Sequence, residues 1–271
     1  GGFEGNGQTL RILSKLEAHT LDFGLDPTRR SLLSILKYPV NYSCLRRAKL
    51  PDETKPLKTK ASDWKPPKCY HDDEKDVMEW ILRPFDSEDR EHFTSFHSPT
   101  KEKNGKSREE SLHTTIMELA DDIAYGVHDL EDAIALRLIT REKWLETQGK
   151  FDSHWVNERE LQDIENQLFG ESWQRKRAIG AIVHAFIVSS RIILSNPIPY
   201  HSPLLKFRVE LCRSSRDALD ALRNLVKEEV IHTPEVQTLE YRGQQIVMQM
   251  FEAIASDPSR LLNSHFKNLW K

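Results

Sequence analysis

The segment between residues 109 and 138 constrains the fold more than any other part of the chain. Its apolar residues recur three or four positions apart, which is the spacing of one face of an α-helix. At about 100° per residue they fall on a single stripe, which is formed by Ile116, Leu119, Ile123, Val127, Leu130 and Ile134. The opposite stripe carries Asp121, Tyr125, His128, Asp129 and Asp132. The pattern predicts a long amphipathic helix with one face against a core.

The polar side of this predicted helix is strongly acidic. Residues 109–136 include eight carboxylates and neither Lys nor Arg. Like charges four residues apart destabilise a helix by a few tenths of a kcal/mol, so solvated helices usually mix acids with bases. Two interpretations remain open. The face is either simply solvated, or it is neutralised by an external cation such as a divalent metal or a group of arginines.

The composition favours helices and excludes several classes of protein. The 271 residues include only 11 Gly and 13 Pro, so we predict an all-α, multi-helix globular fold. The three cysteines have no metal-site or disulfide spacing. A net charge of -3 does not indicate a nucleic-acid or membrane partner. The most apolar stretch, 178–194, contains polar residues and is interpreted as a buried helix.

In the rest of the chain, Gly, Pro and helix-capping residues mark where the predicted elements begin and end. We expect helices at 9–21, 27–36, 72–82, 153–168, 171–194, 215–230 and 234–255. Residues 39–69 contain five prolines and eight Lys or Arg, and form either a solvated loop or a lid that carries cations to an anionic ligand. Alternating residues at 204–211 predict a short β-hairpin. The chain is divided into residues 1–195 and a C-terminal helical segment, 196–271, assigned to packing or oligomer contacts.

Three motifs, in order, resemble one family. FEGNGQTLR at 3–11, KYP at 37–39 and LADDIAY at 119–125 followed by HDLED at 128–132 are similar to segments of the bacterial deoxyguanosinetriphosphate triphosphohydrolase-like proteins of the HD-domain superfamily. The resemblance implies an HD-type catalytic domain over residues 1–195. It also implies a dNTP triphosphohydrolase, which cleaves a dNTP to deoxynucleoside and inorganic triphosphate.

The resemblance implies a metal site made of a His, a His-Asp pair and a distant Asp. The distant Asp corresponds to Asp121, and the bound ion is expected to be Mg²⁺ or Mn²⁺, with another transition metal as an alternative. The other ligands and the catalytic His and Glu correspond to positions before Phe3. The chain is therefore expected to be the C-terminal part of such an enzyme, with no catalytic residue of its own and no turnover alone. His71-Asp72 follows the first motif and is interpreted as a helix start.

The resemblance also assigns residues to the substrate. Tyr125 would pack against the deoxyribose and Asp129 would accept a hydrogen bond from the 3′-hydroxyl. The phosphates would be contacted by four residues, namely Asn6, Lys37, Tyr38 and Lys68. Lys68 departs from the family pattern because Cys-Tyr-His follows it. For Asn6 a second interpretation stays open, in which its side chain caps the first helix.

The same resemblance implies a cytoplasmic homo-oligomer, often a hexamer, that binds a dNTP substrate. A dNTP effector and single-stranded DNA are further partners it allows, and no membrane partner is expected. Two other functions remain open. One is an HD phosphohydrolase with a different nucleotide substrate, and the other is a non-catalytic nucleotide-sensing or oligomerisation module.

Overall fold

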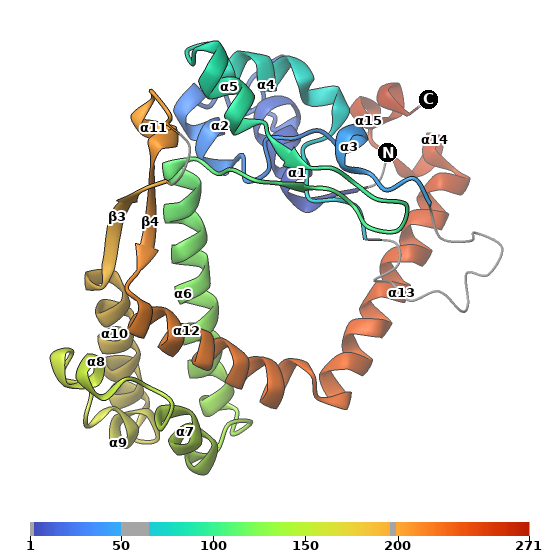
Figure 1. Ribbon diagram of the computed structural model, residues 1–271. Coiled ribbons are helices and arrows are strands. Elements are labelled where there is room, and N and C mark those ends of the chain that lie inside the picture. Colours follow the sequence, from blue (N-terminus) through green and yellow to red (C-terminus); the bar gives the residue numbers. More distant parts are fainter. Residues whose placement is uncertain (1–2, 50–64, 196–198, 271) are drawn as a thin grey trace. The chain divides into compact units, whose positions relative to one another are not determined.

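The computed structural model describes residues 3–49, 65–195 and 199–270 and confirms the predicted all-α fold (Figure 1). Its strands form only two antiparallel pairs in these residues, β1 with β2 and β3 with β4. No helix in the described ranges combines the length and apolarity needed to cross a membrane. The chain divides into two compact units, Gly1–Asp122 with Val188–Cys212, and Ile123–Ile187 with Arg213–Lys271.

The first unit consists of short helices and the two strand pairs (Figure 1). Its helical elements are α1 Gly5–Arg11, the π-helix η1 Ile12–Leu16, α2 Arg29–Ile35, α3 Tyr42–Leu45, the 3₁₀-helix η4 Asp72–Glu74, α4 Lys75–Leu82, α5 Ser87–Phe93 and α11 Pro203–Lys206. Its strands are β1 Phe96–His97, β2 Lys106–Ser107, β3 Ser190–Leu194 and β4 Phe207–Leu211. The longest helix, α6 Leu112–Ala135, begins in this unit and ends in the other.

The core of the first unit joins helices that are far apart in sequence. Leu10 of α1, Leu33 of α2, Ile81 of α4, Phe93 of α5 and Leu205 of α11 belong to one buried cluster. Each is at most 2% exposed. Burial of such a side chain contributes about 1.5–3 kcal/mol, so this cluster holds the residues between these helices in place.

The second unit contains helices and connecting loops, and no strand among its described residues. After the end of α6 it contains α7 Arg141–Gln148, α8 Ser153–Glu158, α9 Ile164–Leu168, α10 Ser172–Val188 (its last residue lies in the first unit), α12 Arg213–Val226, the π-helix η5 Lys227–Ile231, α13 Pro234–Ser256, α14 Pro258–Leu261 and α15 Ser264–Leu269. Trp155 stacks on Phe186 at a centroid distance of 5.4 Å within its core. A Cβ on Gly126 of α6 would lie 2.9 Å from Leu219 Cδ1, so this glycine allows α12 to pack closely.

The structure corrects the prediction for the segment before and after residue 196. The expected helix 171–194 ends at Val188, and Ser190–Leu194 is instead strand β3. The predicted strand at 204–211 is confirmed only for Phe207–Leu211, because Pro203–Lys206 forms α11. Isoleucines 192 and 193 are β-branched and pair with Val209 and Arg208 of β4. Residues 50–64 of the predicted basic lid, 39–69, lie outside the described residues.

Candidate functional site

The side chain of Glu4 organises the N-terminal motif. Its carboxylate is buried, at 3% exposure, and caps α1 by accepting a hydrogen bond from the backbone N–H of Gly7 at 2.9 Å. The other carboxylate oxygen accepts a hydrogen bond from Asn6 Nδ2 at 2.8 Å. Asn6 therefore does not cap the helix, which rules out that alternative. Its amide is held at the start of α1 by Glu4.

Lys68 reaches Glu4 because the segment after it lies against α1. A Cβ on Gly7 would be 3.0 Å from the carbonyl oxygen of Cys69 and 3.2 Å from the backbone nitrogen of His71. Only glycine allows this approach without a shift of the backbone. The Lys68 Nζ consequently lies 3.4 Å from Glu4 Oε1. The motif at residues 3–11 and Lys68 thus meet at one carboxylate.

Tyr38 joins the same group through a short backbone pairing. After α2 ends, the backbone N–H of Tyr70 donates to the carbonyl of Val40 at 3.1 Å, and the N–H of Tyr42 donates to the carbonyl of Tyr70 at 3.0 Å. The pairing holds the segment after α2 beside the segment that carries Lys68. Lys68 Nζ lies 5.9 Å from the centroid of the Tyr38 ring, within the range of a cation–π interaction.

Lys37 connects this group to α6. Its Nζ lies 3.6 Å from Glu118 Oε1. Burial, and then the charge of Glu118, raise the pKa of Glu110 to about 7. Burial, followed by the charges of Glu118, Glu110 and Glu4, raises the pKa of the Tyr38 hydroxyl. Near neutral pH the Tyr38 hydroxyl is therefore protonated and can donate a hydrogen bond, and the Lys37 ammonium faces the Glu118 carboxylate.

The seven residues Glu4, Asn6, Lys37, Tyr38, Lys68, Glu110 and Glu118 are called the lysine cluster below. All four of the predicted phosphate-contacting residues belong to it, and each is linked to another member by a hydrogen bond, an ion pair or a ring contact. Two ammonium groups, an amide and a phenol hydroxyl are donors suited to a polyanion. In the structure, the carboxylate of Glu118 pairs with the Lys37 ammonium, and that of Glu4 pairs with the Lys68 ammonium.

Asp121 lies on the same helix as Glu118, three residues or about 4.5 Å further along its axis. Its side chain is exposed. In the part of the chain that the structure describes, the one group of three His, Cys, Asp or Glu side chains close enough to share an ion is elsewhere, at Asp86, Asp89 and His201. The described residues therefore do not complete a metal centre at Asp121. It offers one carboxylate donor.

Tyr125 and Asp129 belong to the portion of α6 in the second unit. The Tyr125 ring is 37% exposed and lies 5.7 Å from the guanidinium carbon of Arg223. Burial, followed by the charge of Asp132, raises the pKa of Asp129, while His128 opposes the shift. Successive turns of α6 carry Asp121, Tyr125 and Asp129 along one stripe.

His71 and Asp72 begin a helix, as the sequence predicts. His71 precedes the 3₁₀-helix Asp72–Glu74 as its N-cap residue. The Asp72 carboxylate accepts hydrogen bonds from Asn41 Nδ2 at 2.6 Å and Ser43 Oγ at 2.6 Å, which lower its pKa against the effect of burial. This local His-Asp pair is part of the scaffold.

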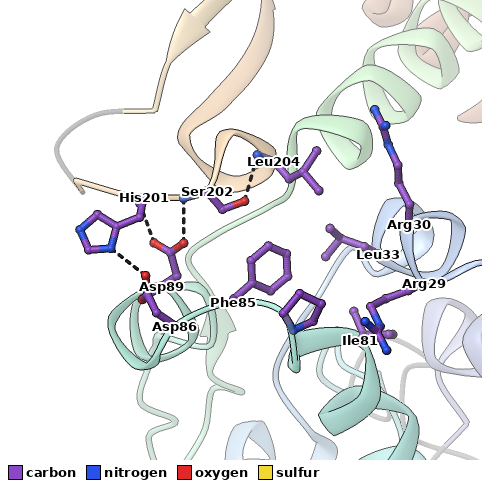
Figure 2. A pocket seen from close by; sticks show the side chains of 11 residues that line it. Arg29, Arg30, Leu33, Ile81, Phe85, Asp86, Asp89, His201, Ser202 and Leu204 are labelled. Carbon is purple, nitrogen blue, oxygen red and sulfur yellow. Dashed lines mark hydrogen bonds and ion pairs between the residues drawn. The ribbon is translucent and has the colours of Figure 1, made fainter.

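A second group of polar side chains lines a pocket elsewhere in the first unit (Figure 2). Asp89 is 1% exposed, and its two carboxylate oxygens accept the backbone N–H groups of His201 at 2.8 Å and Ser202 at 2.9 Å. Asp86 accepts from the Asp89 N–H at 2.8 Å and contacts His201 Nδ1 at 2.7 Å. Every carboxylate oxygen already has a partner, so this group is a latch that holds residues 201–202 and not a prepared metal site.

The sequence did not identify Glu4, Glu110 or Glu118 as functional. Glu4 lies within the first motif, and the two others were counted only among the acids of the long helix. For Glu110 and Glu118, the signal in the sequence was the excess of acidic over basic residues in the long helix. For the Asp86–Asp89–His201 latch no signal existed, because His201 is 112 residues from Asp89 along the chain.

Comparison with known proteins identifies relatives along the whole chain. A deoxyguanosinetriphosphate triphosphohydrolase-like protein of Shewanella oneidensis is 45% identical over 280 residues, and its counterpart in Aliivibrio fischeri is 43% identical over 282 residues. Each alignment includes 100% of this chain and 63% of the relative. The chain thus spans less than two thirds of the length of these relatives.

The C-terminal residues also match a protein-family model. Residues 209–271 correspond to the phosphohydrolase-associated domain. This match covers the end of β4 and all of α12 through α15, and it agrees with the relatives found for the complete chain. The resemblance carried by the three sequence motifs is thereby confirmed: along its whole length the chain is related to the deoxyguanosinetriphosphate triphosphohydrolase-like proteins.

Proposed function

We propose that this chain is the substrate-binding part of a metal-dependent dNTP triphosphohydrolase that releases deoxynucleoside and inorganic triphosphate. The observation that carries the proposal is the lysine cluster, in which Lys37, Tyr38, Lys68 and Asn6 gather around two carboxylates. Four residues separated by up to 62 positions meet at one place. The phosphohydrolase character of the relatives supports the same reaction class.

In the proposed reaction the cluster binds and orients the triphosphate. Lys37 and Lys68 exchange their carboxylate partners for phosphate oxygens, and the Tyr38 hydroxyl donates a hydrogen bond to the same group. The lysines then neutralise the charge that develops on the departing triphosphate. Glu4 keeps the Asn6 amide and the Lys68 ammonium in place before substrate arrives, which reduces the entropy lost on binding.

Asp121 is the residue of this chain that we propose as a metal ligand. A divalent ion at such a site would supply Lewis-acid chemistry to the phosphoryl group. Since the described residues offer one ligand there, we expect this chain alone to bind metal weakly and to show no turnover. Tyr125 and Asp129 are proposed to contact the deoxyribose, with the ring excluding a 2′-hydroxyl. We further propose a cytoplasmic homo-oligomer that binds no membrane.

The test is a binding and product assay on the chain as it is. Binding of dGTP, dATP, dCTP, dTTP and GTP is measured by calorimetry with Mg²⁺ or Mn²⁺, and the products are separated by ion chromatography. We expect deoxynucleotides to bind more tightly than GTP, and the double variant Lys37→Gln/Lys68→Gln to lose binding. The matched control Lys206→Gln removes an exposed lysine of the same unit and should bind like the parent.

The outcomes separate the alternatives. Unchanged binding by the double lysine variant would contradict the placement of the triphosphate. Release of orthophosphate or pyrophosphate instead of triphosphate would indicate another phosphohydrolase, whereas release of triphosphate by the chain alone would contradict its expected inactivity. In any longer form with a His and a His-Asp pair before Phe3, Asp121→Asn should abolish turnover. Nucleotide binding without turnover in that form would favour the nucleotide-sensing alternative.

A further inference from the structure

A cavity of about 350 Å³ lies beside α1 in the first unit. It contains no residue of the lysine cluster and none of the pocket at the Asp89 latch. Its lining comes from Phe3, from α1 itself, from the first residue of α3 and from the start of η4. Its volume is within the range of about 300–1,000 Å³ that is typical of small-molecule sites.

Contacts among the lining segments fix the shape of this cavity. The Asp72 carboxylate accepts hydrogen bonds from Asn41 Nδ2 and Ser43 Oγ, both at 2.6 Å, and so ties the start of η4 to the start of α3. On the other side, Arg11 Nη1 lies 3.4 Å from Asp73 Oδ2, which links α1 to the same short helix. Because its walls are joined in this way, the cavity is preorganised, and less entropy is lost when a ligand binds.

Three polar side chains of the lining have no hydrogen-bond partner among the described residues. They are the amide of Gln8, the hydroxyl of Tyr42 and the imidazole of His71. Burial, followed by the charge of Arg11, lowers the pKa of His71, so near neutral pH its ring is uncharged and offers one donor and one acceptor. Each of the three groups can therefore both donate and accept, which suits a ligand that carries donors as well as acceptors.

The charges of the lining disfavour an anionic ligand. Asp73 is paired with Arg11, and Asp72 adds a second carboxylate to the same wall. An ionised carboxylate only accepts hydrogen bonds, so the part of a ligand that faces this wall must donate. Phe3 adds an aromatic ring that is 72% exposed and on which a flat ring can stack. The lining therefore suits an uncharged, planar heterocycle with an amino group.

We propose that this cavity binds the adenine ring of a free nucleoside, which stacks on Phe3 and forms hydrogen bonds with the unpartnered amide, hydroxyl and imidazole. A glutamine amide matches the amino group and the neighbouring ring nitrogen of adenine with one acceptor and one donor. The adenine amino group is also a donor for the carboxylate wall. The site does not depend on the proposed reaction, because a nucleoside carries no phosphate and the cavity shares no side chain with the lysine cluster.

The probe is adenosine, titrated calorimetrically into the complete chain and compared with inosine, in which a carbonyl oxygen replaces the adenine amino group. Adenosine should bind about fivefold more tightly, because inosine turns an acceptor towards the carboxylates. Phe3→Ala removes the stacking ring and should weaken adenosine binding about tenfold or more. Tyr42→Phe removes only a hydroxyl and should weaken it about two- to tenfold. The matched control Phe23→Ala removes another exposed ring of the same unit, outside the cavity, and should bind like the parent.

Both variants should keep the parent's circular dichroism, because Phe3 is largely exposed and phenylalanine retains the Tyr42 ring. Adenosine binding that is unchanged in both Phe3→Ala and Tyr42→Phe would overturn the proposal. Binding that is lost in Tyr125→Ala but kept in Phe3→Ala would place adenosine at the proposed deoxyribose contact and would overturn it as well. So would inosine binding as tightly as adenosine. The double variant Lys37→Gln/Lys68→Gln should still bind adenosine, even where it no longer binds tripolyphosphate, so the two proposals can fail separately.

Discussion

Lys37→Gln should weaken the binding of inorganic tripolyphosphate far more than Lys68→Gln. The two lysines carry the same charge but differ in environment. The side chain of Lys37 is 20% exposed and that of Lys68 is 61% exposed. Water and salt screen an exposed ammonium, whereas a shielded one keeps most of its interaction with an anion.

The exposures set the expected magnitudes. A shielded hydrogen bond to a charged group contributes about 1.5–3 kcal/mol, so loss of Lys37 should reduce affinity by about 10- to 150-fold. An exposed ion pair contributes about 0–1 kcal/mol, so loss of Lys68 should cost about fivefold or less. Because Glu118 competes with the anion for Lys37, Glu118→Gln should instead strengthen binding.

The assay is isothermal titration calorimetry with tripolyphosphate at an ionic strength near 0.15 M, on variants whose circular dichroism matches the parent. Lys206→Gln serves as the charge-matched control. A loss for Lys68→Gln equal to or greater than that for Lys37→Gln would refute the reasoning from burial. So would weaker binding by Glu118→Gln.

Three further predictions concern stability and titration. Asp89→Asn leaves one acceptor for two backbone donors, so it should lower the free energy of unfolding in urea by about 2–3 kcal/mol; a change under 0.5 kcal/mol would contradict the latch. Because the folded pKa of Glu110 is raised from 4.5 to about 7, the folded state binds more protons in that range, and stability should fall as pH rises from 4.5 to 7. Glu110→Gln should flatten this part of the pH profile, and an unaltered slope would count against the assignment. A hydrogen bond to Asp86, followed by its charge, raises the pKa of His201 above 6.5; this contribution to stability is complete below 6.5 and is lost as pH rises through the folded value. Asp86→Asn should bring the His201 midpoint, followed by NMR, back towards 6.5, and no movement of that midpoint would contradict the ion pair.

The elements with strong local signals were predictable from the sequence. The apolar stripe of residues 109–138 predicted a helix that the structure contains as Leu112–Ala135. The start of α7 is also set by near neighbours, because the Thr140 side chain accepts a hydrogen bond from the Lys143 N–H. These features depend on neighbours within one or two turns, so the sequence pattern contains all the necessary information.

The errors occurred where a distant segment determines the local structure. Residues 190–194 continue an apolar helical pattern, but they pair with Phe207–Leu211 across an antiparallel ladder. Strand pairing depends on partners that the local periodicity cannot specify. One further error was local: Asn6 was one of two interpretations for the cap of α1, whereas Glu4, two residues earlier, takes that role.

The sequence alone predicted the long acidic helix and singled out the motif residues Asn6, Lys37, Tyr38, Lys68 and Asp121. The meeting of Lys37 with Glu118 and of Lys68 with Glu4 was decided only by the tertiary structure. Helical periodicity is a property of adjacent residues, so it can be read along the chain. The distance between two side chains that are 64 or 81 residues apart depends on how the helices pack, including the buried cluster of α1, α2 and α4, and that packing arises only in the folded molecule.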